Sequence, residues 1–377
     1  MLRRDLSLAK KIGQLFMVGF EGTAITPELA TWMETYGWGG VILFGRNVES
    51  PAQLLTLTRG LQTARRRGPM PLLIAVDQEG GRVARLKAPF TAFPSAARVG
   101  QTASEPLAYE VGQTLGRELC AVGINMDMAP VLDVLTNPVN TVIGDRAFST
   151  DPQSVARQGV AFMRGLHAAG ILAVAKHFPG HGDTWLDSHV ALPRSERTDA
   201  QLRACELLPF QEAIGAGLQA IMTAHVIFKA WDPAHPATVS SSILSGILRA
   251  ELGFSGVIIS DDLGMAAVSE TTPWEEVPLR AIRAGVDLLL ICHQRQRQER
   301  AYTSVLRAIE RGELPETLVD GALARVQALK SRLHCRLQDG ATAPTLACIG
   351  STEHQALVAT VVEQSAQLAT REEPHGD

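Results

Sequence analysis

Short apolar runs alternate with longer amphipathic stretches along almost the whole chain, and this alternation constrains the fold more than any other feature. Eight runs rich in valine, isoleucine and leucine occur, at residues 14–20, 40–44, 71–77, 124–129, 172–176, 220–224, 256–260 and 286–291. Runs of this kind are typical of parallel strands that are covered on both faces. The stretches between them often begin at Asp, Ser or Thr with a proline nearby, as helices do.

Helices are therefore predicted between the strands. Their expected ranges are 26–36, 51–66, 104–121, 151–169, 199–216, 241–252, 274–284 and 296–311, with a further helix near 316–333. Eight alternating strand and helix units predict an α/β protein of the (β/α)8 TIM-barrel type. A doubly wound open sheet is the rival, but no Gly-x-Gly-x-x-Gly follows the first strand and no Gly-x-x-x-x-Gly-Lys-Ser/Thr occurs.

The length fits one large domain with a short extension. The chain has 377 residues, 46% of them hydrophobic and 20% charged, which is enough apolar material for one large core. We expect the barrel to occupy residues 1–335 and a partly helical or mobile extension to occupy 336–377. The connections 130–150 and 178–198 are far longer than the usual ~4–6 residues, which is typical of functional loops.

Charge and cysteine content argue against several functional classes. The net charge of −4 does not favour nucleic acid or an anionic membrane surface, and no apolar run approaches the ~20 residues of a membrane span. The five cysteines are far apart and form no Cys-x-x-Cys pair, so a reducing compartment is favoured. Without a recognisable export signal, we expect a cytoplasmic protein, and we favour a monomer.

Polar residues end several predicted strands on the side where a barrel carries its active site. They are Asp77 after the third run, Lys176 and His177 after the fifth, His225 after the sixth, and Asp261 and Asp262 after the seventh. Any one of them could be polar simply because strand ends meet water. Their convergence on one rim favours a functional site.

The segment 176–189 carries the densest group of titratable residues. Its glycines and proline indicate a shaped loop. Asp187 lies two residues before His189, close enough to fix the tautomer of the imidazole and raise its basicity. His189 could then act as an acid and afterwards as a base. The alternative is a surface pair that is bonded only to its own loop.

A metal site is a second interpretation of this loop, because His177, His181, Asp183 and His189 are all possible ligands. A barrel metallohydrolase is expected to carry His-x-His after its first strand, and this strand is followed by Glu-Gly-Thr. No His-Glu-x-x-His motif is present either. We expect no metal and no organic cofactor, and we keep the metal-dependent barrel hydrolase as an alternative.

Two further groups of residues suit a sugar substrate. A carboxylate at a rigid strand end needs only ionisation and placement to attack an anomeric carbon. Of Asp261 and Asp262, one is expected to face the barrel mouth and the other to cap a helix. Asp77, Arg85 and Arg146 could hold sugar hydroxyls, although exposed arginines are more often surface ion-pair partners.

The motifs that carry a family resemblance extend over nearly the whole chain. They lie at 12–20, 40–44, 75–83, 123–125, 129–133, 143–148, 176–183 with 187–189, 222–225 and 260–263. With them the chain resembles the bacterial β-N-acetylglucosaminidases, or β-N-acetylhexosaminidases, of glycoside hydrolase family 3 in their short single-domain form. The Lys-His-Phe-Pro-Gly-His loop joined to Asp-Ser-His is highly specific, whereas Ser-Asp-Asp-Leu alone is weak.

The resemblance implies a retaining hydrolase that removes a terminal non-reducing N-acetylglucosamine. It implies that Asp261 is the nucleophile, that His189 is the acid/base and that Asp187 is its partner. The sugar-binding positions that it implies are Asp77, Arg85, Arg146, Lys176 and His177. Short cytoplasmic members of the family act on N-acetylglucosaminyl-1,6-anhydro-N-acetylmuramyl (peptide) fragments, so the implied partner is a small carbohydrate or muropeptide from peptidoglycan recycling.

Two other classes remain open. A glycoside phosphorylase would use the same residues with phosphate in place of water, because a neutral imidazole repels the anion less than a carboxylate does. A non-catalytic sugar-binding barrel would keep Asp77 and the arginines but would need neither Asp261 nor the pair formed by Asp187 and His189.

Overall fold

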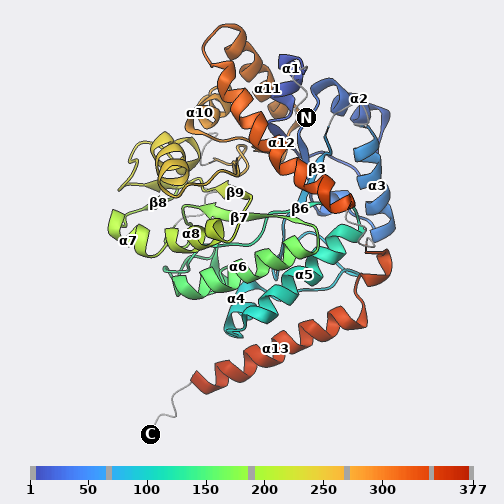
Figure 1. The fold of residues 1–377 in the computed structure, drawn as a ribbon, viewed down its shortest axis with the longest axis vertical. Coiled ribbons are helices and arrows are strands. Elements are labelled where there is room, and N and C mark those ends of the chain that lie inside the picture. Colours follow the sequence, from blue (N-terminus) through green and yellow to red (C-terminus); the bar gives the residue numbers. More distant parts are fainter. Residues whose placement is uncertain (1–5, 65–69, 186–191, 267–271, 339–343, 373–377) are drawn as a thin grey trace.

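Eight parallel strands form the centre of the molecule (Figure 1). The computed structural model describes residues 6–64, 70–185, 192–266, 272–338 and 344–372. The strands are β1 (Phe16–Val18), β2 (Gly40–Leu43), β3 (Leu73–Val76), β6 (Met126–Asp127), β7 (Leu172–Phe178), β9 (Ala220–Thr223), β11 (Val257–Ile259) and β12 (Leu289–Ile291). Their order is β11-β9-β7-β6-β3-β2-β1-β12. A parallel bridge between Ile259 and Leu288 joins the two ends of this order, so the sheet closes into a barrel.

Helices surround the barrel, and each predicted apolar run contains one strand, which confirms the (β/α)8 fold. The outer helices are α2 (Pro27–Tyr36), α3 (Pro51–Ala64), α5 (Glu105–Ala121), α6 (Pro152–Ala168), α7 (Asp199–Ala204), α8 (Leu207–Gly215), η4 (Ser242–Glu251), α10 (Val277–Ala284) and α11 (Arg295–Glu310). The single helix predicted over 199–216 is wrong, because the chain divides it into α7 and α8. Glu206 lies at that break, with its carboxylate buried against Arg197.

The structure also contains short helices and strands that the sequence pattern did not predict. They are α1 (Leu8–Gly13), η1 (Gly45–Asn47), β4 (Gln78–Gly80), β5 (Val83–Ala84), α4 (Ala96–Gln101), η2 (Gly144–Arg146), β8 (Arg194–Ser195), β10 (Ile227–Phe228), η3 (Ala237–Val239) and η5 (Leu346–Cys348). β4 and β5 form an antiparallel hairpin directly after β3. β8 pairs with β10 beside the barrel. Both pairs lie in the connections that follow barrel strands.

Three of the predicted helices begin with an N-cap residue. Thr26 accepts a hydrogen bond from the backbone of Leu29, Ser104 from that of Leu107, and Asp151 from that of Ser154. Each cap is followed by a proline in the first helical turn. The side chain satisfies a backbone N–H that has no partner inside the helix, and proline lacks an N–H that would need one.

Helix α12 (Glu316–Gln338) belongs to the barrel, because its buried Lys330 reaches the loop before β2. The Nζ atom of Lys330 donates to the carbonyl of Gly39 at 2.6 Å and to Oε1 of Gln14 at 3.0 Å. The helix continues past residue 335, where the sequence suggested a boundary. None of the described helices is both long enough and apolar enough to cross a membrane.

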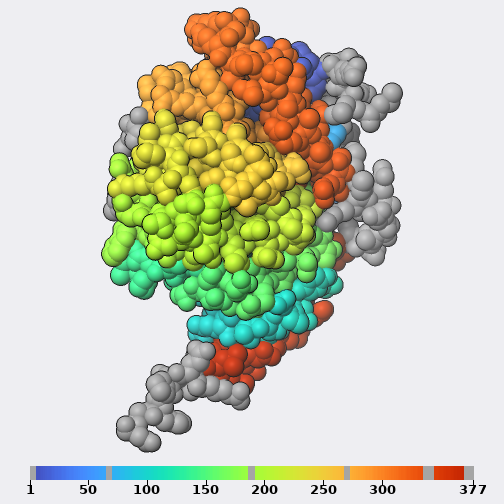
Figure 2. Space-filling view, turned by 60° about the vertical axis from the view of Figure 1, so that its left-hand side comes forward, coloured from blue at the N-terminus to red at the C-terminus, as the bar shows by residue number. Residues whose placement is uncertain are grey.

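Helix α13 (Thr352–Glu372) lies against α4 and α5 on the outside of the barrel, and Figure 2 shows it in red beside the cyan segments. Val361 and Ser365 are fully buried there, and His354 is 3% exposed. The Nδ1 atom of His354 is 2.7 Å from Oε1 of Glu118. The last helix therefore packs on the barrel through a specific buried pair as well as through apolar contact.

Candidate active site

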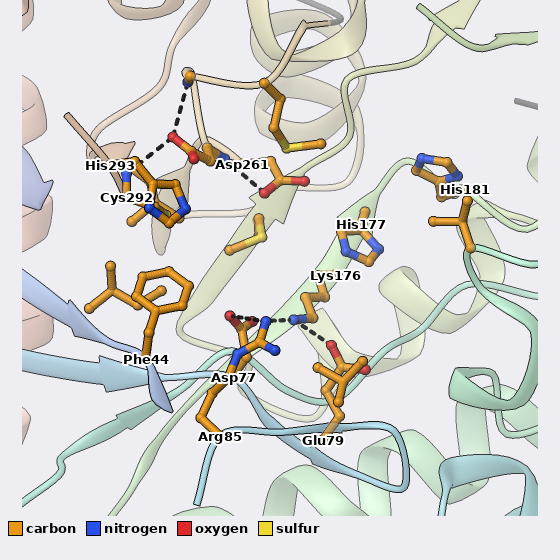
Figure 3. Close-up of a pocket in the computed structure, with 18 of the residues that line it drawn as sticks. Phe44, Asp77, Glu79, Arg85, Lys176, His177, His181, Asp261, Cys292 and His293 are labelled. Carbon is orange, nitrogen blue, oxygen red and sulfur yellow. Dashed lines mark hydrogen bonds and ion pairs between the residues drawn. The ribbon is translucent and has the colours of Figure 1, made fainter. Parts of the chain in front are cut away.

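A cavity of about 900 Å³ opens at the carboxyl ends of the barrel strands (Figure 3). Asp77 follows β3, Lys176 and His177 belong to the end of β7, and Asp261 follows β11. All four line this cavity, as does Cys292 after β12. The polar strand ends singled out in the sequence, His225 apart, thus meet in one place.

Lys176 is the centre of a buried ionic cluster on one wall. Its Nζ atom lies 2.8 Å from Oδ1 of Asp77 and 2.6 Å from Oε1 of Glu79, and only 3% of its side chain is exposed. Burial alone would lower the pKa of Lys176, but the two carboxylates outweigh it and raise that pKa. Arg85 approaches the other oxygen of Asp77 at 3.5 Å. A charged ammonium and a carboxylate are therefore held together at the wall of the cavity.

Arg146, in η2, is held by Glu79 through two parallel hydrogen bonds of 2.8 Å. Burial would raise the pKa of Glu79, but Lys176 and Arg146 outweigh it and lower that pKa to about 2. The pKa of Arg146 is raised in turn, because Glu79 outweighs the effect of burial. Sequence reasoning missed Glu79, although its position two residues after Asp77 in Asp-Gln-Glu was a usable signal.

Asp133 fixes the imidazole of His177. Its Oδ2 atom is 2.7 Å from Nδ1 of His177, and its Oδ1 atom accepts the backbone N–H groups of His177 and His181. Burial would raise the pKa of Asp133, but the His177 imidazole outweighs it and the pKa is lowered. The ionised carboxylate keeps a proton on Nδ1, and Nη2 of Arg146 donates to Nε2 at 3.4 Å.

Asp261 lies across the cavity from this cluster (Figure 3). One of its oxygens, Oδ1, accepts the backbone N–H of Asp262 at 2.7 Å. Burial would raise the pKa of Asp261, but the imidazoles of His225 and His177 and the Asp262 amide outweigh it, so the pKa is lowered. Asp261 is therefore ionised near neutral pH, which is the state that a carboxylate nucleophile requires.

Asp262 supports the loops around Asp261. Its Oδ1 atom accepts the backbone N–H groups of Gly264 at 3.0 Å and Cys292 at 3.1 Å. This carboxylate thus ties the turn after β11 to the end of β12. The helix start that Asp262 was expected to cap runs into residues 267–271, outside the described residues. His225 holds the same turn, because its Nε2 atom is 3.0 Å from the carbonyl oxygen of Asp262.

Of the four candidate metal ligands, His189 lies outside the described residues, and the other three are bonded to different partners. His177 is bonded to Asp133, whereas Nδ1 of His181 is 2.8 Å from the hydroxyl of Thr184. Burial lowers the pKa of His181 to about 4. Asp183 is bonded to Ser195. Within the described ranges no group of three or more His, Cys, Asp or Glu side chains is arranged to hold a metal ion.

Asp187 and His189 lie in the segment 186–191, outside the described residues. The other predicted site residues share the cavity: Asp77, Arg85, Arg146, Lys176, His177 and Asp261. Sequence reasoning assigned no role to Glu79 or Asp133. It also missed the wall formed by Phe44 and His293, whose rings lie 5.2 Å apart.

Comparisons with known proteins agree on one family. Residues 7–329 match the N-terminal domain of glycosyl hydrolase family 3. A β-hexosaminidase of Alkalilimnicola ehrlichii is 43% identical over 283 residues, which cover 74% of this chain and 80% of that protein. The family 3 β-N-acetylglucosaminidase of Paenibacillus sp. FPU-7 superimposes with a TM-score of 0.91 at 41% identity, over 96% of this chain and 69% of that one. NagZ of Neisseria gonorrhoeae, solved with N-trifluoroacetyl-D-glucosamine, gives a TM-score of 0.75 at 32% identity, over 93% of this chain and 98% of that one.

Proposed function

This chain belongs to glycosyl hydrolase family 3 as a β-hexosaminidase-type enzyme, and on that premise we propose that it is a retaining exo-β-N-acetylglucosaminidase with a covalent glycosyl-aspartate intermediate. The observation that carries the proposal is the placement of Asp261. Its pKa is lowered, and it lies across one cavity from the cluster around Lys176.

The cluster around Lys176 is suited to holding a terminal sugar. Asp77 offers carboxylate oxygens, while Lys176, Arg85 and Arg146 offer charged N–H donors. The Nε2 atom of His177 accepts hydrogen bonds, because Asp133 keeps the proton on Nδ1. Charged donors and acceptors fixed by buried partners orient a sugar ring without needing to reorganise on binding.

The reaction proceeds in two displacements. Asp261 attacks the anomeric carbon while the bond to the aglycone oxygen breaks, and His189 gives its proton to that oxygen. A water molecule then attacks the anomeric carbon, His189 takes the proton of the water, and the bond to Asp261 breaks. Each attack inverts the anomeric centre, so the product keeps the configuration of the substrate. Asp187 orients His189, as the family resemblance implies.

The substrate that we propose is an N-acetylglucosaminyl-1,6-anhydro-N-acetylmuramyl fragment, with or without its peptide, in cytoplasmic peptidoglycan recycling. The family resemblance supports this choice. The cavity of about 900 Å³ is large enough for a disaccharide, because binding sites of this size bury most of a drug-sized ligand.

The decisive experiment compares an aryl N-acetyl-β-glucosaminide with the matching aryl β-glucoside and follows the first product by NMR. We expect strong preference for the acetamido sugar, since groups aimed at a substituent are left unpaired by an analogue that lacks it, and initial release of the β-anomer. Initial release of the α-anomer would contradict the covalent mechanism. A slowly hydrolysed fluorinated glycosyl fluoride should label Asp261, which peptide mass spectrometry can locate.

The alternatives give different products or requirements. A phosphorylase would release sugar 1-phosphate in phosphate buffer, whereas the hydrolase releases the free sugar in every buffer. A metal-dependent hydrolase would lose its activity after prolonged EDTA treatment and recover it with zinc, whereas we expect the activity to survive.

A further inference from the structure

One wall of the active-site cavity comes from the connections after β11 and β12 and has no part in the reaction described so far. In the closed barrel β11 lies opposite β3, so this wall faces the Asp77 side of the Lys176 cluster across the cavity. His293, labelled in Figure 3, belongs to it. We call this wall the outer wall, and its residues are Gly264, Met265, Ala266, His293, Gln294 and Arg297.

The guanidinium of Arg297 is fixed on the outer wall by its neighbours. Its Nη1 atom donates to the carbonyl of Gly264 at 3.3 Å, and its central carbon lies 5.1 Å from the centre of the Trp274 ring. Trp274 is buried, and its Nε1 atom donates to the backbone carbonyl of Arg297 at 3.0 Å. A guanidinium that is already stacked on an anchored ring loses little freedom when it binds a ligand.

The first turn of α11, which carries Arg297, is also fixed to the barrel. Nε2 of the buried Gln298 donates to the carbonyls of Gly19 at 2.9 Å and Ile291 at 2.8 Å. Gln294, directly before the helix, has a φ of +56°, which is unfavourable for a residue with a side chain. Backbone strain of this kind persists where the surrounding structure imposes it, and it is frequent at ligand sites.

Arg297 differs from the other arginine and lysine side chains of the cavity in its electrostatic surroundings. Each of the others has a carboxylate partner: Arg82 has Asp145, Arg85 has Asp77, Arg146 has Glu79, and Lys176 has both Asp77 and Glu79. The contacts of the Arg297 guanidinium within the described residues are the Gly264 carbonyl and the Trp274 ring, with no carboxylate among them. The outer wall therefore presents a positive charge that the described part of the protein does not neutralise.

We propose that Arg297 is a specificity-determining residue that binds a carboxylate on the aglycone. This inference rests on the proposed function. A terminal sugar held by the Lys176 cluster, with its anomeric carbon at Asp261, leaves the outer wall to the rest of the substrate. The planar N–H fork of a guanidinium matches the two oxygens of a carboxylate, and the resulting bonds are charge-assisted. A substrate with an acidic aglycone gains this contact, and a neutral one does not.

The test uses the full chain and two disaccharides, N-acetylglucosaminyl-β-1,4-N-acetylmuramic acid and the same compound with its carboxylate converted to a carboxamide. The wild type should prefer the acid. Arg297→Gln should lose about 10-fold in kcat/KM on the acid and less than about 2-fold on the amide. The loss should lie mainly in KM, because the contact is present in both the ground state and the transition state. Arg297→Glu should lower the acid-to-amide ratio further, because like charges repel.

The matched control is Arg295→Gln on the same turn of α11. Arg295 also stacks on a tryptophan, with its guanidinium carbon 5.3 Å from the centre of the Trp32 ring. It differs in being paired with Glu299 and in not lining the cavity. This variant should leave kcat/KM on both disaccharides unchanged.

Three results would overturn the role of Arg297. The first is a wild type that does not prefer the acid. The second is an Arg297→Gln variant with equal losses on acid and amide, or with the same acid-to-amide ratio as Arg297→Glu. The third is formation of sugar 1-phosphate by the wild type that Arg297→Gln abolishes, which would assign the cation to free phosphate. Failure of the proposed function is distinguishable, because it would appear with the wild type alone as no retaining cleavage of the aryl N-acetyl-β-glucosaminide.

Discussion

The Asp133 carboxylate binds His177 through both of its oxygens: Oδ2 meets the ring Nδ1 at 2.7 Å, and Oδ1 accepts the backbone N–H at 3.2 Å. Both contacts are buried. The carboxylate therefore sets the position of the backbone, the orientation of the ring and the nitrogen that carries the proton. The sugar contact that we propose for His177 would therefore depend on Asp133, which does not itself line the cavity.

Asp133→Asn should weaken sugar binding, because the amide can present an N–H to Nδ1 and so favour the other tautomer. We expect kcat/KM to fall by about 10-fold or more and inhibition by free N-acetylglucosamine to weaken in parallel. Glu118→Gln is the matched control, since Glu118 and His354 form an equally short buried pair beneath α13. It should lower stability and leave kcat/KM unchanged; equal kinetic losses in both variants would show a structural effect only.

Glu79→Gln should be strongly destabilising, because it leaves Lys176 and Arg146 buried with less compensating charge. Removal of one partner from such a cluster costs about 3–5 kcal/mol. The pKa of Glu79 is lowered from 4.5 to about 2. The contribution of its ionised carboxylate to the free energy of unfolding is therefore present above pH 4.5 and is lost as the pH falls toward 2. Urea unfolding should show that the difference in free energy of unfolding between wild type and variant becomes smaller as the pH falls from 4.5 to 2. A constant gap would contradict the lowered pKa.

Glu206→Gln tests a pKa shift in the opposite direction to that of Glu79. Burial raises the pKa of Glu206 from 4.5 to about 7 despite Arg197, and Oε2 is buried with no hydrogen-bond partner among the described residues. The contribution of the Glu206 carboxyl group to the free energy of unfolding is fully present below pH 4.5 and is lost as the pH rises through 7. The wild type should therefore lose up to about 1.4 kcal/mol per pH unit relative to the glutamine variant. Parallel urea-unfolding curves across this range would disprove the raised pKa.

The sequence predicted the barrel because the alternation of apolar runs and amphipathic stretches matches the alternation of strands and helices in the structure. Each strand is a short buried run, and a residue that ends such a run must lie at the rim. Asp77, Lys176 and Asp261 could be located by this reasoning alone. The number of strands and the place of the cavity follow from the same pattern.

The partners of these residues could not be predicted in the same way. Glu79 meets Arg146 across 67 positions of sequence, and Asp133 meets His177 across 44. Such contacts depend on how neighbouring loops fold over the rim, which local periodicity does not encode. The break between α7 and α8 was missed as well, and Glu206 at that break is paired with Arg197 from the segment before α7.

Removal of residues 352–377 should leave the chemistry intact and lower stability. No α13 residue lines the cavity within the described part of the chain. Truncation exposes the surface covered by Val361 and deprives the buried Glu118 of His354, and a buried carboxylate without its partner is costly. We expect a lower Tm with kcat/KM unchanged well below it. Loss of activity in a folded truncated chain would show that α13 acts on the site.

Asp262→Ala should destabilise the loops after β11 and β12 without removing a reacting group. The backbone N–H of the buried Cys292 loses its acceptor, and a buried N–H group that is left unsatisfied costs about 1–3 kcal/mol. Some activity should remain in the folded fraction. The comparison with Asp261→Ala by circular dichroism and kinetics then decides which carboxylate of the pair reacts.

Asp261→Ala should be nearly inactive on every aryl glycoside, because no acidity of the aglycone can replace the missing nucleophile. His189→Ala should differ in kind. An activated phenol leaves without protonation and still forms the glycosyl-enzyme, whereas a sugar aglycone reacts very slowly, so the defect grows with the pKa of the leaving group. Asp187→Ala should show a milder form of the same dependence, since the imidazole remains. Activity retained by Asp261→Ala but lost by Asp262→Ala would reverse the assignment of the nucleophile, and a uniform defect in His189→Ala would place the acid/base elsewhere.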